Sequence, residues 1–432
     1  MSIYKNWVQK NTLIPWRLRH SLEEWLETKC WCQHPRLYRW VHFGQIADPV
    51  QQATFGPRHH FFGYYEKSPW NASGHLLLAH EADFNDRAPR AADSVTVGMV
   101  RLDDNKRFVA LGKSQAWNWQ QGTMLQWHPT KPDQWLLHND RRNGRFLGVL
   151  RDTEGRELNT YERPIYAVTP DGRYGYSLNF ARLYTHRPGY GYAGVKDPWA
   201  DDIQPRADGI HRLDLSTGES ELIVSLHRLA QLNPRQDMRD NFHWINHIQV
   251  APDNSRIAFF HIWRVGETGW RVRLYTAAAD GSQLNCLLDT DFISHYDWLD
   301  GQRLMIWAKD EDDARGNFLL CDDRDNGTTI IGQDVLTEDG HCSFSPDRYW
   351  VLNDTYPDAY GMRILMLYRW RDGKRFDLAR LYSPKERWWG EIRCDLHPRW
   401  SRNGKRICVD SVHNGERQMY ILDIQDIVRT QP

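Results

Sequence analysis

The chain of 432 residues has no excess of either charge, because 55 lysines and arginines balance 56 aspartates and glutamates. This balance argues against a nucleic-acid partner, which usually requires a basic excess. No apolar run approaches the length of a membrane-spanning helix, and the N-terminus lacks an apolar core followed by small residues, as a signal peptide would have. The 7 cysteines are odd in number and irregularly spaced, so they do not describe a disulfide framework. We therefore expect a cytoplasmic protein.

Several familiar catalytic motifs are also missing. The sequence contains no phosphate-binding GxxxxGK[ST] loop, no GxSxG nucleophile elbow and no HExxH zinc helix. Aromatic residues, in contrast, are frequent, with 21 tryptophans and 19 tyrosines. Most of them suit twisted antiparallel sheets packed face to face, and a minority of exposed rings would suit stacking on sugars.

A short pattern recurs along the chain: alternating residues, a turn rich in Pro, Asp, Asn and Gly, and then a second apolar strand. Most intervals between copies are roughly 40–60 residues, which is typical of propeller blades. The interval between the third and fourth copies is about twice as long and contains an insertion at 184–206. A second hairpin follows each copy, so two hairpins make one four-stranded blade. The seven copies lie at 64–80, 125–140, 166–180, 248–262, 296–308, 342–354 and 397–411.

The predicted fold is therefore an all-β, seven-bladed β-propeller, spanning 46–432. Residues 1–45 form a short N-terminal helical extension, because Trp16, Leu18, Leu22, Trp25 and Leu26 recur at helical spacing. We expect this basic, tryptophan-rich extension to pack against the outer wall of the propeller. The alternative is peripheral contact with a membrane surface or a partner.

Four histidines occupy equivalent positions when the copies are aligned on their turns. His247, His341 and His397 each precede the turn residue by six positions, and His295 lies within one residue of that place. Inner strands of a propeller surround one axis, so the four side chains converge on one volume. Imidazole ligands from separate elements are typical of a metal site, and we predict a divalent metal, zinc or manganese, there. Cys342, Cys394, Asp395 or Gln249 are additional candidate ligands; the opposite interpretation is that the histidines bond to inner-strand backbone.

A second group of polar residues belongs to the first blades. Its histidine, tyrosine and arginine side chains suit β-elimination from a uronic acid, which needs a cation on the carboxylate, a base for the neighbouring C–H and an acid for the leaving oxygen. Glycoside hydrolysis needs a facing pair of carboxylates instead, and no persuasive pair is present. The predicted catalytic residues are Tyr166, Arg182 on the second strand of the third copy, His128, His138 and His243; the predicted substrate-binding residues are His59, His60, Tyr64 and Tyr190.

The segments HHFFGYYEKSPWN, LQWHP…ND and YAVTPDGRYGYSLNFARLYTHRPGYGY resemble the seven-bladed propeller polysaccharide lyases of the ulvan lyase type and, more distantly, the oligogalacturonate lyases. The resemblance covers about residues 55–425 and implies a lyase acting on an acidic glycan. It also implies that Tyr166 is the acid or base, that Arg182 neutralises the uronate, and that His128 or His138 is the partner histidine. A metal in this family has a structural or a catalytic role, and both stay open here.

Such lyases are normally exported, whereas this chain begins with a basic helix. The resemblance therefore implies action on oligosaccharides inside the cell or diversion to another role. The rival hypothesis is a non-catalytic propeller that binds a glycan or a protein partner through one face, because propellers serve many functions.

Overall fold

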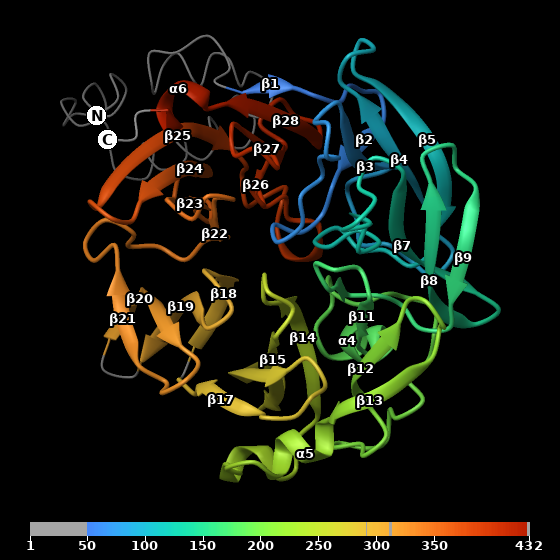
Figure 1. Cartoon of the computed structure of the whole chain (residues 1–432), viewed down its shortest axis with the longest axis vertical. Coiled ribbons are helices and arrows are strands. Elements are labelled where there is room, and N and C mark those ends of the chain that lie inside the picture. Colours follow the sequence, from blue (N-terminus) through green and yellow to red (C-terminus); the bar gives the residue numbers. More distant parts are fainter. Residues whose placement is uncertain (1–49, 291, 311–312, 430–432) are drawn as a thin grey trace, which may run out of the picture.

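The computed structural model describes residues 50–290, 292–310 and 313–429. Seven four-stranded antiparallel sheets surround a central axis, which confirms the predicted seven-bladed β-propeller (Figure 1). The predicted N-terminal helical extension, 1–45, lies outside the described residues. Within the described part of the chain, no helix combines the length and apolar character needed to cross a membrane.

Each sequence copy forms the inner hairpin of one blade. The strands of blades 1 to 3 are, from the axis outward, β2 (His59–Phe61), β3 (Leu76–Ala82), β4 (Val95–Arg101) and β5 (Arg107–Ser114); β6 (Gln126–Trp127), β7 (Trp135–Arg142), β8 (Arg145–Asp152) and β9 (Glu157–Tyr161); and β10 (Ala167–Val168), β11 (Tyr174–Ser177), β12 (Gly209–Asp214) and β13 (Ser220–Ser225).

Blades 4 to 6 repeat this order, and blade 7 closes the ring with a strand from the other end of the described chain. β1 pairs with β28 through Gln51 and Ile421, so the first described strand is the outermost strand of the last blade. The strands are β14 (His243–Val250), β15 (Arg256–Val265), β16 (Gly269–Ala278) and β17 (Asn285–Leu288); β18 (Phe292–Trp298), β19 (Arg303–Asp310), β20 (Asp313–Asp322) and β21 (Thr328–Ile331); β22 (Ser343–Phe344), β23 (Trp350–Asp354), β24 (Met362–Arg369) and β25 (Lys374–Tyr382); and β26 (Arg399–Trp400), β27 (Arg406–Ser411), β28 (Gln418–Asp423) and β1 (Gln51–Gln52).

One local prediction is wrong: Arg182 does not lie on a strand. β11 ends at Ser177, and the Asn179 side chain accepts hydrogen bonds from the backbone N–H groups of Ala181 and Arg182, which begins helix α4 (Phe180–His186). Asparagine is among the strongest helix N-caps, so its side chain stops the strand pairing and starts a helix. The other helices among the described residues are α5 (Leu226–Gln231), α6 (Gln425–Val428) and the 3-10 turns η2 (Gln236–Met238) and η3 (Gly390–Ile392).

The inner strands are irregular where the aligned histidines lie. The pairing of β14 with β15 shifts register between Asn246 and Gln249, and His247 in this gap has φ 54°. β18 shifts in the same way between Ile293 and Tyr296, around His295. Such bulges add a residue to one strand and re-aim its side chain.

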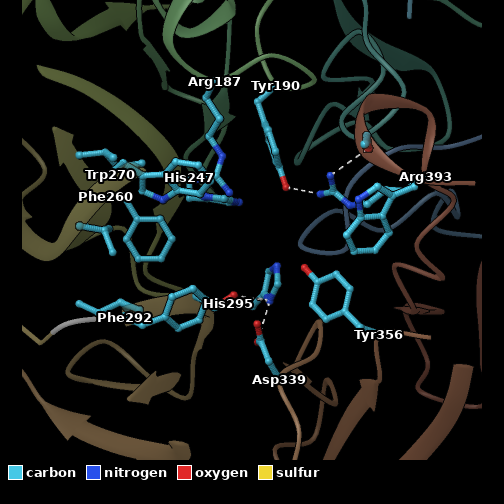
Figure 2. Close-up of a pocket in the computed structure, with 16 residues that line it drawn as sticks. Arg187, Tyr190, His247, Phe260, Trp270, Phe292, His295, Asp339, Tyr356 and Arg393 are labelled. Atoms are coloured by element: carbon cyan, nitrogen blue, oxygen red, sulfur yellow. Dashed lines mark hydrogen bonds and ion pairs between the residues drawn. The ribbon is translucent and has the colours of Figure 1, made fainter. Parts of the chain in front are cut away.

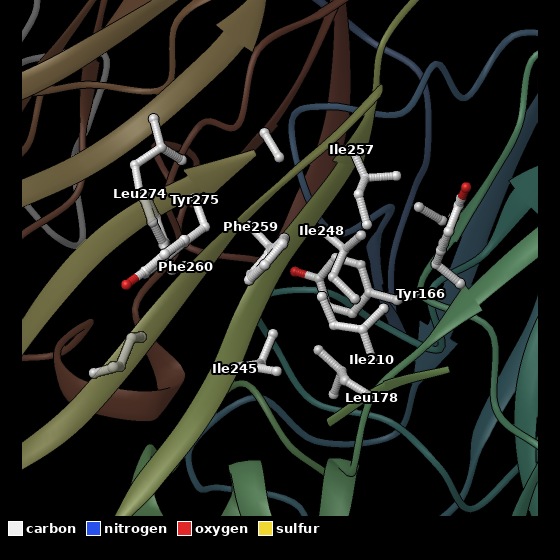
Figure 3. Packing of buried hydrophobic residues seen from close by; sticks show 14 of the residues in the cluster. Tyr166, Leu178, Ile210, Ile245, Ile248, Ile257, Phe259, Phe260, Leu274 and Tyr275 are labelled. Carbon is white, nitrogen blue, oxygen red and sulfur yellow. The ribbon is translucent and has the colours of Figure 1, made fainter. Parts of the chain in front are cut away.

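Apolar residues fill the space between neighbouring blades. Figure 3 shows part of a buried cluster that includes Tyr166 and Leu178 of blade 3 together with Ile248, Ile257 and Leu274 of blade 4. This packing fixes the inner strands relative to one another, and therefore fixes the side chains at the axis.

Candidate functional site

A pocket of about 520 Å³ lies beside the axis, against the inner strands of blades 4 and 5. Arg187 and Tyr190 form one side of it, whereas His295, Asp339 and Tyr356 form the opposite side (Figure 2). Its lining residues are Arg187, Tyr190, His247, Phe260, Ile262, Trp270, Val272, Phe292, Ile293, Ser294, His295, Asp339, Tyr356, Trp389, Gly390 and Arg393.

The four aligned histidines come together next to this pocket. The ring centroids are 4.1 Å apart for His295 and His341, 4.4 Å for His341 and His397, and 6.4 Å for His247 and His295. His247 and His295 line the pocket itself. The alignment of the internal copies on their turns therefore located side chains from four consecutive blades that the fold brings into contact.

Tyr64, a predicted substrate-binding residue, stands among these histidines instead of lining the pocket. Its ring centroid lies 4.9 Å from those of His247 and His397, and its hydroxyl is hydrogen-bonded to Nε2 of His247. Burial raises the pKa of Tyr64 well above its usual value, so the phenol keeps its proton at neutral pH.

An ion pair of blade 7 holds the Tyr64 segment in place. Arg399 donates to the carbonyl oxygens of Gly63 and Tyr64 at 2.6 and 3.2 Å, respectively. Asp410 accepts hydrogen bonds from the backbone N–H groups of Phe62 and Gly63, and it pairs with Arg399 at 2.7 Å. Blade 7 therefore positions a residue of blade 1 at the axis.

His341, Asp395 and His397 form a group that can hold a metal ion, because one ligand atom from each lies within 4.8 Å of the others. Nε2 of both histidines is buried without a hydrogen-bond partner among the described residues. Nδ1 of His341 lies 2.9 Å from the Asp354 carboxylate, an arrangement that leaves Nε2 free to act as a ligand.

The donors of this group suit a divalent cation. Burial alone would raise the pKa of Asp395, but the neighbouring Arg393 and Arg363 guanidinium groups hold it well below its usual range, so the carboxylate is charged. Burial keeps the pKa of His397 well below its usual value, so this imidazole is neutral. Imidazole nitrogens and a carboxylate are ligands that zinc and manganese accept. The group contains two of the four predicted metal ligands and Asp395, whereas His247 and His295 fall outside it.

The two pocket histidines differ in their partners. His295 Nδ1 lies 3.1 Å from the Asp339 carboxylate and 2.9 Å from the Ser294 hydroxyl. His247 Nδ1 has no hydrogen-bond partner in the described part of the chain. Burial, and next the positive charge of Arg187, lower the pKa of His247 well below its usual value, so its imidazole is neutral.

The pocket contains two arginines, and only one has its N–H groups occupied. Arg393 donates to the Asp395 carboxylate and to the Tyr190 hydroxyl, both at 2.6 Å. The Arg187 guanidinium makes no hydrogen bond and no ion pair with any residue that the structure describes, and its Nε atom is buried without a partner. Arg187 is thus a cation available to an anionic ligand.

Arg182, the predicted neutraliser of the uronate, is placed elsewhere. Its side chain is 1% exposed and pairs with the buried Asp197 at 3.1 Å. Its remaining N–H groups donate to backbone oxygens of Trp199, Asp202, Ile203 and His243. It does not line the pocket and has no donor left for a ligand, because the guanidinium anchors α4 to blade 4.

Tyr166, the predicted acid or base, is buried in the apolar cluster of Figure 3. Its hydroxyl accepts a hydrogen bond from Gln121 at 2.7 Å and lies 3.4 Å from Asn246, the neighbour of His247. Burial raises the pKa of Tyr166 well above its usual value. Tyr166 therefore supports the strand that carries His247 without lining the pocket.

The other predicted histidines also lie outside the pocket, and internal contacts surround them. His128 contacts Thr130 and the Trp135 ring; His138 contacts the Asn139 carbonyl and Arg151; His243 contacts His261 and the Met238 carbonyl; His59 contacts Asn85; and His60 contacts Gln418 and Glu81. Of the predicted substrate-binding residues, Tyr190 alone lines the pocket.

Sequence reasoning missed five residues of the pocket lining, namely Arg187, Asp339, Tyr356 and the exposed tryptophans Trp270 and Trp389. One signal was available for the first of these. The insertion at 184–206, which lengthens the interval between the third and fourth copies, contains both Arg187 and Tyr190. Long connections in a regular repeat are frequent carriers of function.

No protein-family model matches the chain, and no curated protein sequence matches it. Solved structures match its fold. An oligogalacturonate lyase in complex with manganese matches with a TM-score of 0.62 and 17% identity, over 88% of this chain and 94% of that one. The oligogalacturonate lyase of Vibrio parahaemolyticus matches with a TM-score of 0.60 and 14% identity, over 87% and 93% of the two chains. At these identities the likeness shows the propeller fold alone, and the resemblance to the ulvan lyase type stays a prediction.

Proposed function

We propose that the protein is a lyase that cleaves a uronic-acid-containing glycan by β-elimination. The observation that carries this proposal is the available guanidinium of Arg187 in a pocket that also contains the neutral imidazole of His247. An arginine fork matches a carboxylate in geometry, and pairing with it acidifies the C–H bond beside that carboxylate. The oligogalacturonate lyases of similar fold act on uronate oligomers, as their name says, and this supports the proposal.

The pocket supplies one residue for each step. Arg187 binds the uronate carboxylate, and His247 takes the proton from the neighbouring carbon atom. The C–H electron pair becomes a carbon–carbon double bond, the bond to the glycosidic oxygen breaks, and that oxygen receives a proton. Tyr356 is the proposed donor, because burial raises the pKa of its hydroxyl well above the usual value and so keeps it protonated.

His341, Asp395 and His397 would hold a divalent metal ion beside this pocket. Such an ion supplies positive charge that stabilises negative charge on a substrate oxygen. The complex of a similar lyase with manganese supports this assignment, and zinc is the alternative.

The lining residues disfavour glycoside hydrolysis. That reaction uses two carboxyl groups on opposite sides of the bond, and Asp339 is the one carboxylate among the residues that line the pocket. The rival function is binding of a glycan without cleavage, and the experiment below distinguishes it from lyase activity.

The test is the ultraviolet absorbance of an unsaturated uronate product, followed while the protein is incubated with uronate polymers and oligomers, with and without zinc or manganese. We expect a rise with at least one substrate. Arg187→Met should lower the rate by roughly 10²–10³-fold, as removal of a charge-stabilising group does. Arg145→Met, which removes an exposed arginine outside the pocket, is the matched control. No rise with any substrate, from folded and metal-supplemented protein, would favour the binding function.

A further inference from the structure

Arg187 is held differently from three other arginines of this fold. Arg182 pairs with Asp197, Arg399 with Asp410, and Arg393 with Asp395, so that a carboxylate fixes each guanidinium. No carboxylate of the described residues pairs with Arg187, although it lines the pocket. Something else must restrict this long side chain, which has many rotamers.

Two aromatic rings contact the Arg187 guanidinium. Its central carbon lies 4.7 Å from the centroid of the Tyr190 ring and 4.8 Å from the centroid of the Trp270 ring. The face of an aromatic ring attracts a cation without accepting its N–H groups in strong hydrogen bonds. These contacts therefore hold the charge while leaving the donors to a ligand, whereas a carboxylate would compete with the ligand for them.

The two rings are not equivalent. Tyr190 is 3% exposed, and its hydroxyl is fixed by Arg393. Trp270 is 44% exposed at the start of β16, close to the turn that follows β15. A large indole gains little from burial at such a position, so packing of the core does not explain it. Figure 2 shows Trp270 beside Arg187 at the wall of the pocket.

We propose that Trp270 is a positioning residue that holds Arg187 by a cation–π contact and thereby makes the pocket selective for anionic sugars. The ligand class, a uronate, rests on the proposed function; the contact between Trp270 and Arg187 does not. A guanidinium held in its binding orientation loses less conformational entropy when the carboxylate arrives, which strengthens binding of the anion specifically. A neutral sugar gains nothing from this restriction.

The test compares affinity for galacturonate with affinity for galactose, measured by titration calorimetry on the full chain. Trp270→Leu should lower this ratio by roughly tenfold, the loss expected for one partly desolvated cation–π contact. Trp270→Phe should retain most of the ratio, because a phenyl ring restores the aromatic face. Trp270→Glu should lower the ratio further, since its carboxylate would compete for Arg187.

Trp389 provides the matched control. It is an exposed tryptophan of the same pocket, 56% exposed, and its ring contacts Lys385 instead of Arg187. Trp389→Leu should weaken both sugars by the same factor and leave the ratio at its wild-type value. Thermal unfolding of each variant checks that the fold is retained.

Failure of this proposal is distinguishable from failure of the proposed function. Wild-type protein that shows no preference for galacturonate, or a Trp270→Leu variant with the wild-type ratio, would overturn the role of Trp270. Selective binding of galacturonate that depends on Trp270, without formation of an unsaturated product, would support Trp270 while removing the lyase activity.

Discussion

Blades 2 and 4 both carry histidines on the inner hairpin, and one from each, His138 and His247, shows how different their surroundings are. His138 lies on β7, where one ring nitrogen contacts the Asn139 carbonyl at 3.0 Å and the other lies 3.4 Å from Arg151. His247 lies in the register shift of β14, lines the pocket and keeps one ring nitrogen without a partner among the described residues. His138 on the regular strand β7 is therefore used internally, whereas His247 in the register shift of β14 lies at the pocket.

The two ends of α4 show the same contrast with arginine. The guanidinium of Arg182, in the first turn, pairs with Asp197 and donates hydrogen bonds to backbone oxygens. Arg187, immediately after the last turn, lies in the pocket. Arg182 anchors the helix on blade 4, and the anchored helix in turn places Arg187 at the pocket. Residue type alone does not separate an anchor from a ligand-binding group.

The largest effect should come from His247. Replacing it with glutamine removes the proposed base, and we expect a fall of roughly 10²–10⁴-fold in kcat, the usual contribution of such a group. His138→Gln should leave kcat within a factor of about two, because this residue is remote from the proposed chemistry. Both rates are read from product absorbance under saturating substrate. A wild-type rate for His247→Gln, together with a large loss for His295→Gln, would assign the base to His295 and reverse the comparison of blades.

Removal of Arg182 should destabilise the protein instead of slowing the reaction directly. Arg182→Met leaves the buried carboxylate of Asp197 without its cation, and the loss of one partner of a buried ion pair costs about 3–5 kcal/mol. The measurement is the free energy of unfolding from urea titration. Arg187→Met, just after the same helix, should cost less, about 0.5–2 kcal/mol, because it loses cation–π contacts with Tyr190 and Trp270 but breaks no buried ion pair. Equal losses in both variants would contradict the division of roles along α4.

The repeats made the fold predictable, because each copy of the turn pattern became an inner hairpin and the alignment of the turns located four histidines in contact. Arg182 and Tyr166 were misplaced for a local reason. Asn179 caps a helix where alternation favoured a second strand, and Tyr166 was placed by resemblance although its ring packs into the core. Arg187 was missed because its position depends on a connection outside the repeat, and Asp339 and Tyr356 because no spacing relates them to His295. Contacts that depend on loop conformation carry no period in the sequence.

The smallest expected effect concerns His138, and it is a change in how the free energy of unfolding depends on pH. It tests whether this histidine is buried and neutral in the folded protein. Burial lowers the pKa of His138 from 6.5 to about 4 in the folded protein. Above pH 6.5 the His138 side chain is neutral in both the folded and the unfolded state. Between pH 6.5 and 4 it binds a proton in the unfolded chain but stays neutral in the folded protein. This residue therefore lowers the free energy of unfolding by up to about 3 kcal/mol as the pH falls through that window. The free energy of unfolding of His138→Gln should decline less steeply with falling pH than that of the wild type, whatever the absolute stabilities. Parallel pH curves would show that His138 has the same pKa in the folded and unfolded states, and would remove the contrast between a buried histidine in blade 2 and the pocket-lining His247 in blade 4.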